Sequence, residues 1–242
     1  MRAVLLAPAR SLPAGALPLG LGLGLLAVLW SGAAPGAALP GVGPDSFSAH
    51  MIRHMGIVAV ASPLVAFGLS RLYPALVGLV PPGFALVASF AEFAVVWGWH
   101  APALHDAARA STGLFLVEQG SFLLAGLGLW IGAFGTAHAE GRAARAGGVL
   151  ALLLTSMHMT LLGALLLLGP RPLYAFGDLC RPGAAMTPLG DQALGGVIML
   201  LVGGAAYLAG GLTLLRPLLG GGRDAERGPR HAPAPDLRSS LP

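Results

Sequence analysis

The feature that most constrains this chain is a series of apolar runs, each roughly 20 residues long. An α-helix of that length spans the hydrocarbon core of a bilayer. Apolar residues make up 55% of the 242 residues and charged residues only 10%, whereas soluble domains carry about 25% charged residues. Too few polar side chains are present to cover a surface in contact with water. The sequence therefore predicts an all-α protein, a polytopic helical membrane bundle.

We count about six candidate transmembrane helices by this criterion. They cover approximately residues 12–33, 50–69, 83–99, 112–134, 147–168 and 192–215. The first could equally be a signal peptide, because the Ala-rich stretch at 33–38 suits a cleavage site. We therefore divide the chain into a first transmembrane or signal-like segment over 1–33, a membrane bundle over 34–215, and a basic tail over 216–242 that is predicted to be disordered.

Arginine supplies every positively charged side chain other than histidine, because the chain contains no lysine. The segments on the N-terminal side of the membrane hold Arg2, Arg10, Arg71, Arg142, Arg145 and the five arginines from Arg216 to Arg238. The loops on the other side hold only Arg109, Arg171 and Arg181. Positive residues favour the cytoplasmic side, so both termini are predicted to be cytoplasmic in a multi-pass protein of the cell membrane. The scatter of these arginines argues against nucleic-acid binding.

Two histidines at the head of the second span are candidate metal ligands. His50 and His54 lie four residues apart, which on a helix places their Cβ atoms about 5–6 Å apart on one face. Met51 and Met55 repeat this spacing on the neighbouring face. Imidazole and thioether donors together suit copper, especially Cu(I), better than magnesium or calcium. A plainer interpretation is a polar helix start with packing methionines, but recurrence of the pattern at Met157-His158-Met159 favours metal binding.

Further side chains able to bind a metal share the predicted outer half of the membrane. His100 closes the third span, Glu118 lies about two turns into the fourth, and Asp191 opens the sixth. The single cysteine, Cys180, excludes an internal disulfide and is predicted to be a loop residue. In chain order, the candidate metal ligands are His50, Met51, His54, Met55, His100, His158 and Met159.

Glu92 and His158 fall near the middle of their spans. Ionisable groups at that depth are costly unless paired, so both are functional candidates. A hydrogen bond between them that only locks two helices together is the structural alternative. With a rise of 1.5 Å per residue, His158 would lie roughly 10 Å deeper than His54. Two separate sites, or one site closed by a kink at Pro63, are both compatible with the sequence.

Four motifs in this chain resemble those of the cytochrome c oxidase assembly factor CtaG family. They are Ser48-Ala49-His50-Met51-Ile52-Arg53-His54-Met55, Trp99-His100-Ala101-Pro102, Ser156-Met157-His158-Met159 and Pro188-Leu189-Gly190-Asp191-Gln192. The resemblance extends over about residues 50–207. It departs from the family pattern at Gln119, where the family often has a histidine. The resemblance implies a protein that helps to mature a haem-copper oxidase, around its copper centre.

The predicted function is a non-enzymatic assembly factor that binds copper and helps to deliver it to a cytochrome c oxidase subunit. Its expected partners are that subunit, the lipid bilayer and a periplasmic or extracytoplasmic copper donor. One alternative is a haem-binding electron carrier, which would need histidines on different helices at equal depth. Another is a transporter of a small solute or metal, although the chain shows no internal repeat pair of the kind many transporters carry.

Overall fold

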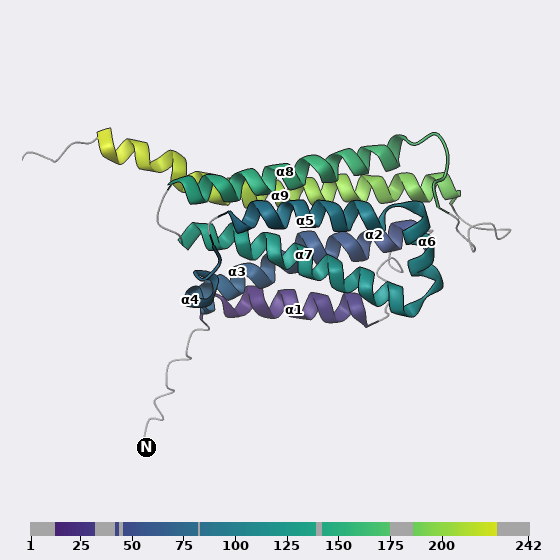
Figure 1. The fold of residues 1–242 in the computed structure, drawn as a ribbon, viewed down its shortest axis with the longest axis horizontal. Helices are drawn as coiled ribbons and strands as arrows, with labels where there is room; N and C mark the ends of the chain where they lie inside the picture. Colours follow the sequence, from purple (N-terminus) through teal and green to yellow (C-terminus); the bar gives the residue numbers. More distant parts are fainter. Residues whose placement is uncertain are drawn as a thin grey trace, which may run out of the picture.

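The computed structural model of this chain describes residues 13–31, 42–43, 46–81, 83–138, 142–174 and 186–226. Within those residues every regular element is a helix, which confirms the predicted all-α class. The elements are α1 (Ala16–Trp30), α2 (Phe47–Met55), the π-helix η1 (Gly56–Ala61), α3 (Ser62–Leu72), α4 (Pro74–Val77), α5 (Phe84–Trp99), α6 (Pro102–Ala110), α7 (Thr112–His138), α8 (Arg142–Leu168) and α9 (Pro188–Glu226). The long helices lie side by side in one elongated bundle (Figure 1).

Among the described residues, four helical stretches are long and apolar enough to cross a membrane. They are Phe47–Leu72, Thr112–Gly135, Arg142–Leu168 and Pro188–Leu219. The pair α5 and α6 adds a fifth candidate if it counts as one span, although it is bent by 72°. The apolar helix α1 has only 15 residues. Each predicted span thus coincides with a helix, while the number of six crossings stays a prediction.

The last helix extends beyond the predicted start of the tail at residue 216. Helix α9 continues through Pro217 to Glu226, and the guanidinium of Arg142 donates to the carbonyl of Leu218 across 3.2 Å. Leucines continue on both sides of Pro217, so this part of the chain retains apolar surface that a disordered tail would lack. Residues 227–242, the proposed cleavage stretch at 33–38 and Cys180 lie outside the described residues.

The second predicted span is a composite of α2, η1 and α3. Its irregular part is the π-helical turn η1, which begins directly after Met55. Pro63 has no backbone N–H and cannot donate to the carbonyl four residues earlier, so a regular α-helical pattern is interrupted at this place. The widened turn also leaves the carbonyl of Val58 free to accept from the indole N–H of Trp130 at 2.9 Å. Such π-turns are frequent beside functional sites.

The two ends of the bundle are formed by different parts of the chain. Helix α6 crosses one end, which we call the α6 end (Figure 1). The first described residues and the last turns of α9 both lie at the opposite end (Figure 1). A Cβ on Gly15 would lie 2.8 Å from the Cβ of Arg71, so the start of α1 sits beside the end of α3. This arrangement agrees with termini on one side of the membrane, and which side that is stays a prediction.

Candidate metal centre

Four histidines from three segments meet at the α6 end of the bundle. His50 and His54 come from α2, His100 caps the C-terminus of α5, and His105 lies on α6. The ring centroid of His50 is 4.9 Å from that of His105 and 5.5 Å from that of His100. The ring of His54 is 5.2 Å from that of His100, and all four side chains are buried. The bend between α5 and α6 brings His100 and His105 onto the face of α2 that carries its histidines.

Helix α7 adds a carboxylate to this group. The Oε1 atom of Glu118 lies 3.9 Å from Nδ1 of His50, and the Glu118 side chain is fully buried. His50, His105 and Glu118 each offer one donor atom, and these atoms lie within 4.8 Å of one another. That separation is small enough for a single metal ion to be shared by the three side chains.

The donor atoms of the cluster have no hydrogen-bond partner. Both ring nitrogens of His50 and His54 are unpartnered, as are Nε2 of His100, Nδ1 of His105 and Oε1 of Glu118. Buried polar atoms are hydrogen-bonded in the great majority of cases, because an unpaired one costs free energy. Many buried polar atoms without a hydrogen-bond partner lie together here. This arrangement indicates a ligand site rather than a packed core.

A neighbouring carbonyl determines which ring nitrogen of His100 can bind a metal. Its Nδ1 lies 2.7 Å from the carbonyl oxygen of Val96, which can only accept, so Nδ1 carries the proton and Nε2 presents a lone pair. The hydroxyl of Tyr174 donates to the carbonyl of His100 at 3.0 Å. Burial raises the pKa of Tyr174, with Asp106 adding to the effect, so the hydroxyl remains a donor. The Tyr174 ring also packs against His105, with centroids 4.5 Å apart.

Arg109 holds one oxygen of Glu118 and leaves the other free. The guanidinium forms an ion pair with Oε2, which also accepts from the side-chain amide of Gln119 at 2.9 Å. Oε1 therefore stays directed at the histidines. The charges of the carboxylate and of the Arg109 guanidinium cancel, so this ion pair adds no net charge to the site.

A carboxylate from α9 orders the start of α2. The Oδ2 atom of Asp191 accepts from the backbone N–H of Phe47 at 2.7 Å, and Oδ1 accepts from that of Ser48 at 3.0 Å and from its hydroxyl. The Ser46 hydroxyl caps the next donor, the N–H of Ala49, at 3.1 Å. The free N–H groups of the first turn are thus satisfied, and the negative charge of Asp191 complements the helix dipole.

The candidate methionines lie away from the histidines. A Cβ on Gly195 would lie 3.0 Å from Cγ of Met51, and one on Gly203 would lie 3.1 Å from Cε of Met55. Both thioethers of α2 therefore pack against α9, and Met159 is buried in the apolar core. Their part in metal binding stays a prediction.

His158 makes no close ring contact with the four histidines, although it lies near enough to His54 to interact with it electrostatically. Its ring lies 5.3 Å from the ring of Phe93, and neither of its nitrogens has a hydrogen-bond partner. The hydrogen bond between Glu92 and His158 that the sequence suggested is not formed. Glu92 instead accepts from the hydroxyl of Tyr207 at 3.0 Å, because α9 brings that side chain into the core.

His105 is a member of the cluster that the sequence analysis missed. The sequence predicts a loop between two spans after Pro102, whereas this segment folds as the short helix α6. A usable signal was present, since His105 and Arg109 lie four residues apart behind a proline suited to start a helix. The sequence indicates that Glu118 is able to bind a metal, but the predicted set of ligands does not include it.

The chain was compared with known proteins at the level of families, curated sequences and solved structures. The family model of the cytochrome c oxidase caa3 assembly factor, Caa3_CtaG, matches residues 17–219. The chain belongs to this family. The match includes every residue of the four-histidine cluster and Glu118, and it confirms the family resemblance seen in the motifs. No curated protein and no solved structure gives a match. As a family member, the protein is a membrane-embedded assembly factor whose partner is cytochrome c oxidase.

Proposed function

We propose that this assembly factor binds copper at His50, His54, His100, His105 and Glu118, and helps to deliver the ion to an oxidase subunit. The observation that carries the proposal is the convergence of unpaired, buried donor atoms from these side chains. Imidazole is a good ligand for copper, and the carboxylate can complete the shell. The ion is cargo in this role, so the protein performs no chemical reaction and is not an enzyme.

The charge of the site supports Cu(I) as the bound form. Arg109 already neutralises the negative charge of Glu118. A bound metal ion therefore brings its full positive charge into a buried site. Burying a monovalent cation then costs less free energy than burying a divalent one, because the free energy lost on leaving water rises with the charge of the ion. This argument supports Cu(I) independently of the thioethers that suggested it in the sequence.

The position of the site supports loading from outside the cytoplasm. Arg71, Arg142 and Arg216 lie at the end of the bundle opposite α6, where positive residues favour the cytoplasm. The α6 end would then face the periplasm or its equivalent in the cell membrane. Among the described residues, Tyr174 packs against His105, so a copper donor on that side would approach the histidines past this ring.

Metal analysis of purified single variants tests this proposal. In His105→Ala and His54→Ala we expect near-normal amounts of protein in the membrane and copper affinity lower by at least about tenfold, because each loses a ligand to the ion. The oxidase in these cells should be present but poor in copper. Binding should also weaken on acidification, because a protonated imidazole has no lone pair to donate.

The matched control is the double variant Met51→Leu/Met55→Leu. Leucine conserves the volume of methionine against α9, so this protein should fold and keep its copper. Loss of copper in this control with retention in His105→Ala would contradict the proposed centre and favour the methionines. Full copper content in both histidine variants, or haem in place of copper in the wild type, would contradict copper handling at this site.

A further inference from the structure

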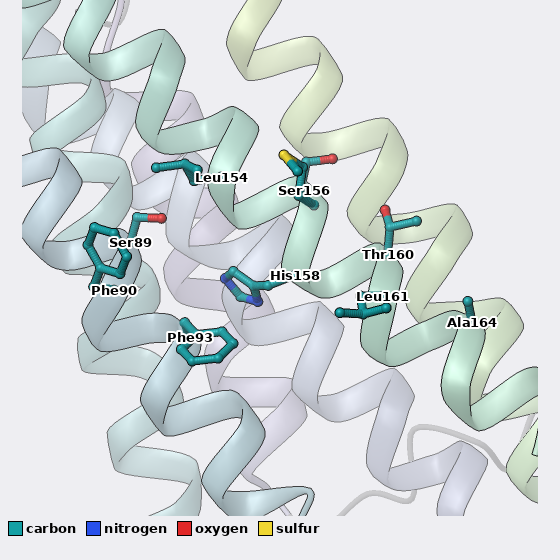
Figure 2. A pocket seen from close by; sticks show the side chains of 10 residues that line it. Ser89, Phe90, Phe93, Leu154, Ser156, His158, Thr160, Leu161 and Ala164 are labelled. Atoms are coloured by element: carbon teal, nitrogen blue, oxygen red, sulfur yellow. The ribbon is translucent and has the colours of Figure 1, made fainter.

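A cavity lies between α5 and α8. It has a volume of about 760 Å³, within the range of about 300–1,000 Å³ that is usual for small-molecule sites. Figure 2 shows Phe90 and Phe93 of α5 on one side and Leu154 and Leu161 of α8 on the other, with the ring of His158 between the helices. The lining is otherwise apolar apart from a few hydroxyl groups.

The cavity opens on the outer surface of the bundle. Phe90 is 65% exposed, and Met157 and Leu161 are each 60% exposed. Helix α8 is a candidate membrane span, and α5 forms one together with α6, so we expect this surface to contact lipid tails. A molecule that enters the cavity from this side must therefore be soluble in the bilayer.

His158 gives the cavity one strong hydrogen-bonding group. Both of its ring nitrogens are buried and unpartnered, although a neutral imidazole offers one donor and one acceptor. The Ser89 hydroxyl in the same cavity is already bonded to that of Thr155 at 2.8 Å. A ring oxygen on a bound ligand would satisfy His158, whereas a bare acyl chain would leave it unpaired at a cost.

The chemistry of the lining side chains limits the class of ligand that the cavity can bind. Within the described residues, none of the side chains that line the cavity is an arginine or a carboxylate. A phospholipid phosphate or the propionates of a haem would therefore be buried there without a counter-charge, which is strongly unfavourable. A neutral aromatic ring with a carbonyl or hydroxyl oxygen and a long apolar tail fits the lining, because Phe90 and Phe93 offer aromatic contacts.

We propose that this cavity binds the ring of a neutral isoprenoid quinone. His158 hydrogen-bonds to one ring oxygen, the ring lies against Phe93, and the tail leaves along the exposed face between α5 and α8. This proposal does not require copper binding at the α6 end.

Fluorescence quenching of the purified protein tests this proposal. The indole of Trp97 lies 5.6 Å from the ring of Phe93, so a quinone in the cavity should quench its emission. A short-chain ubiquinone and a naphthoquinone with the same tail are the probes, and both should give saturable curves. His158→Leu should weaken binding by about tenfold through the loss of one buried hydrogen bond. Ala164→Phe fills the cavity and should abolish saturable quenching.

The control is Ala209→Phe, which makes the same substitution at an exposed position of α9 outside the cavity. It should bind as the wild type does. The amount of protein in the membrane and its melting temperature in detergent serve as the measures of folding. Equal affinity in His158→Leu and wild type, quenching that never saturates, or tight binding of haem in place of quinone would overturn the proposal.

Discussion

At the scale of single residues, Arg109 is the side chain that sets the charge of the candidate metal centre. Its guanidinium is paired with Glu118, one oxygen of which is directed at His50. Removing the guanidinium leaves the buried carboxylate uncompensated and makes the site more attractive to doubly charged ions. Electrostatic effects of this kind persist over several ångströms where water is excluded.

Arg109→Gln should therefore shift the metal preference from copper towards zinc. We expect the ratio of bound zinc to bound copper, measured after loading with an equimolar mixture under reducing conditions, to rise on the order of tenfold. Arg171→Gln is the control, because Arg171 is an exposed arginine that follows α8 and forms no part of the cluster. An unchanged ratio in Arg109→Gln would show that the guanidinium does not govern selectivity.

At the scale of elements, α2 depends on α9 for its orientation. Asp191 accepts from two backbone N–H groups and one hydroxyl at the start of α2, so the cap of this helix is supplied by another helix. The same helix presents Gly195 to Phe47, where an added Cβ would lie only 2.5 Å from Cδ1 of that ring. Helix α9 thereby sets the position of the whole histidine face of α2.

Asp191→Asn should lower both stability and copper binding. The amide keeps the shape of the side chain but has one acceptor oxygen in place of two, so a buried N–H of α2 loses its partner at a cost of about 1–3 kcal/mol. We expect a lower apparent melting temperature in detergent and a weaker copper complex. Thr187→Ala removes an exposed cap at the start of α9 and should lower the melting temperature slightly without affecting copper. Normal copper affinity in Asp191→Asn would mean that the cap does not position the ligands.

At the scale of the whole molecule, Arg71 and Arg142 lie at one end of the bundle and the four-histidine cluster lies at the other. The described ends of the chain share the arginine-bearing end, as the charge bias of the sequence predicts. Reporter fusions after Leu39 and after Pro242 should accordingly report opposite sides of the membrane, with the second in the cytoplasm. Equal signals from the two fusions would contradict the outward-facing metal centre. A fusion within the α8–α9 loop should match the one after Leu39.

The sequence by itself determined the class of the molecule and the places of its helices. Apolar runs of fixed length specify membrane-embedded helices because backbone groups must be satisfied within each segment. The pairing of His50 with His54 could also be predicted, since residues four apart share a helix face by local geometry alone. Both properties depend on neighbours in the chain, and a sequence displays those directly.

Only the tertiary structure decided which residues complete the site. Spacing places Met51 and Met55 on a face of α2 but does not say that α9 covers that face. The bend after α5 brings His105 over α2, and packing of α7 brings in Glu118, although neither lies near the first histidines in sequence. Contacts between helices depend on crossing angles and on small residues at the interfaces, which no single segment encodes.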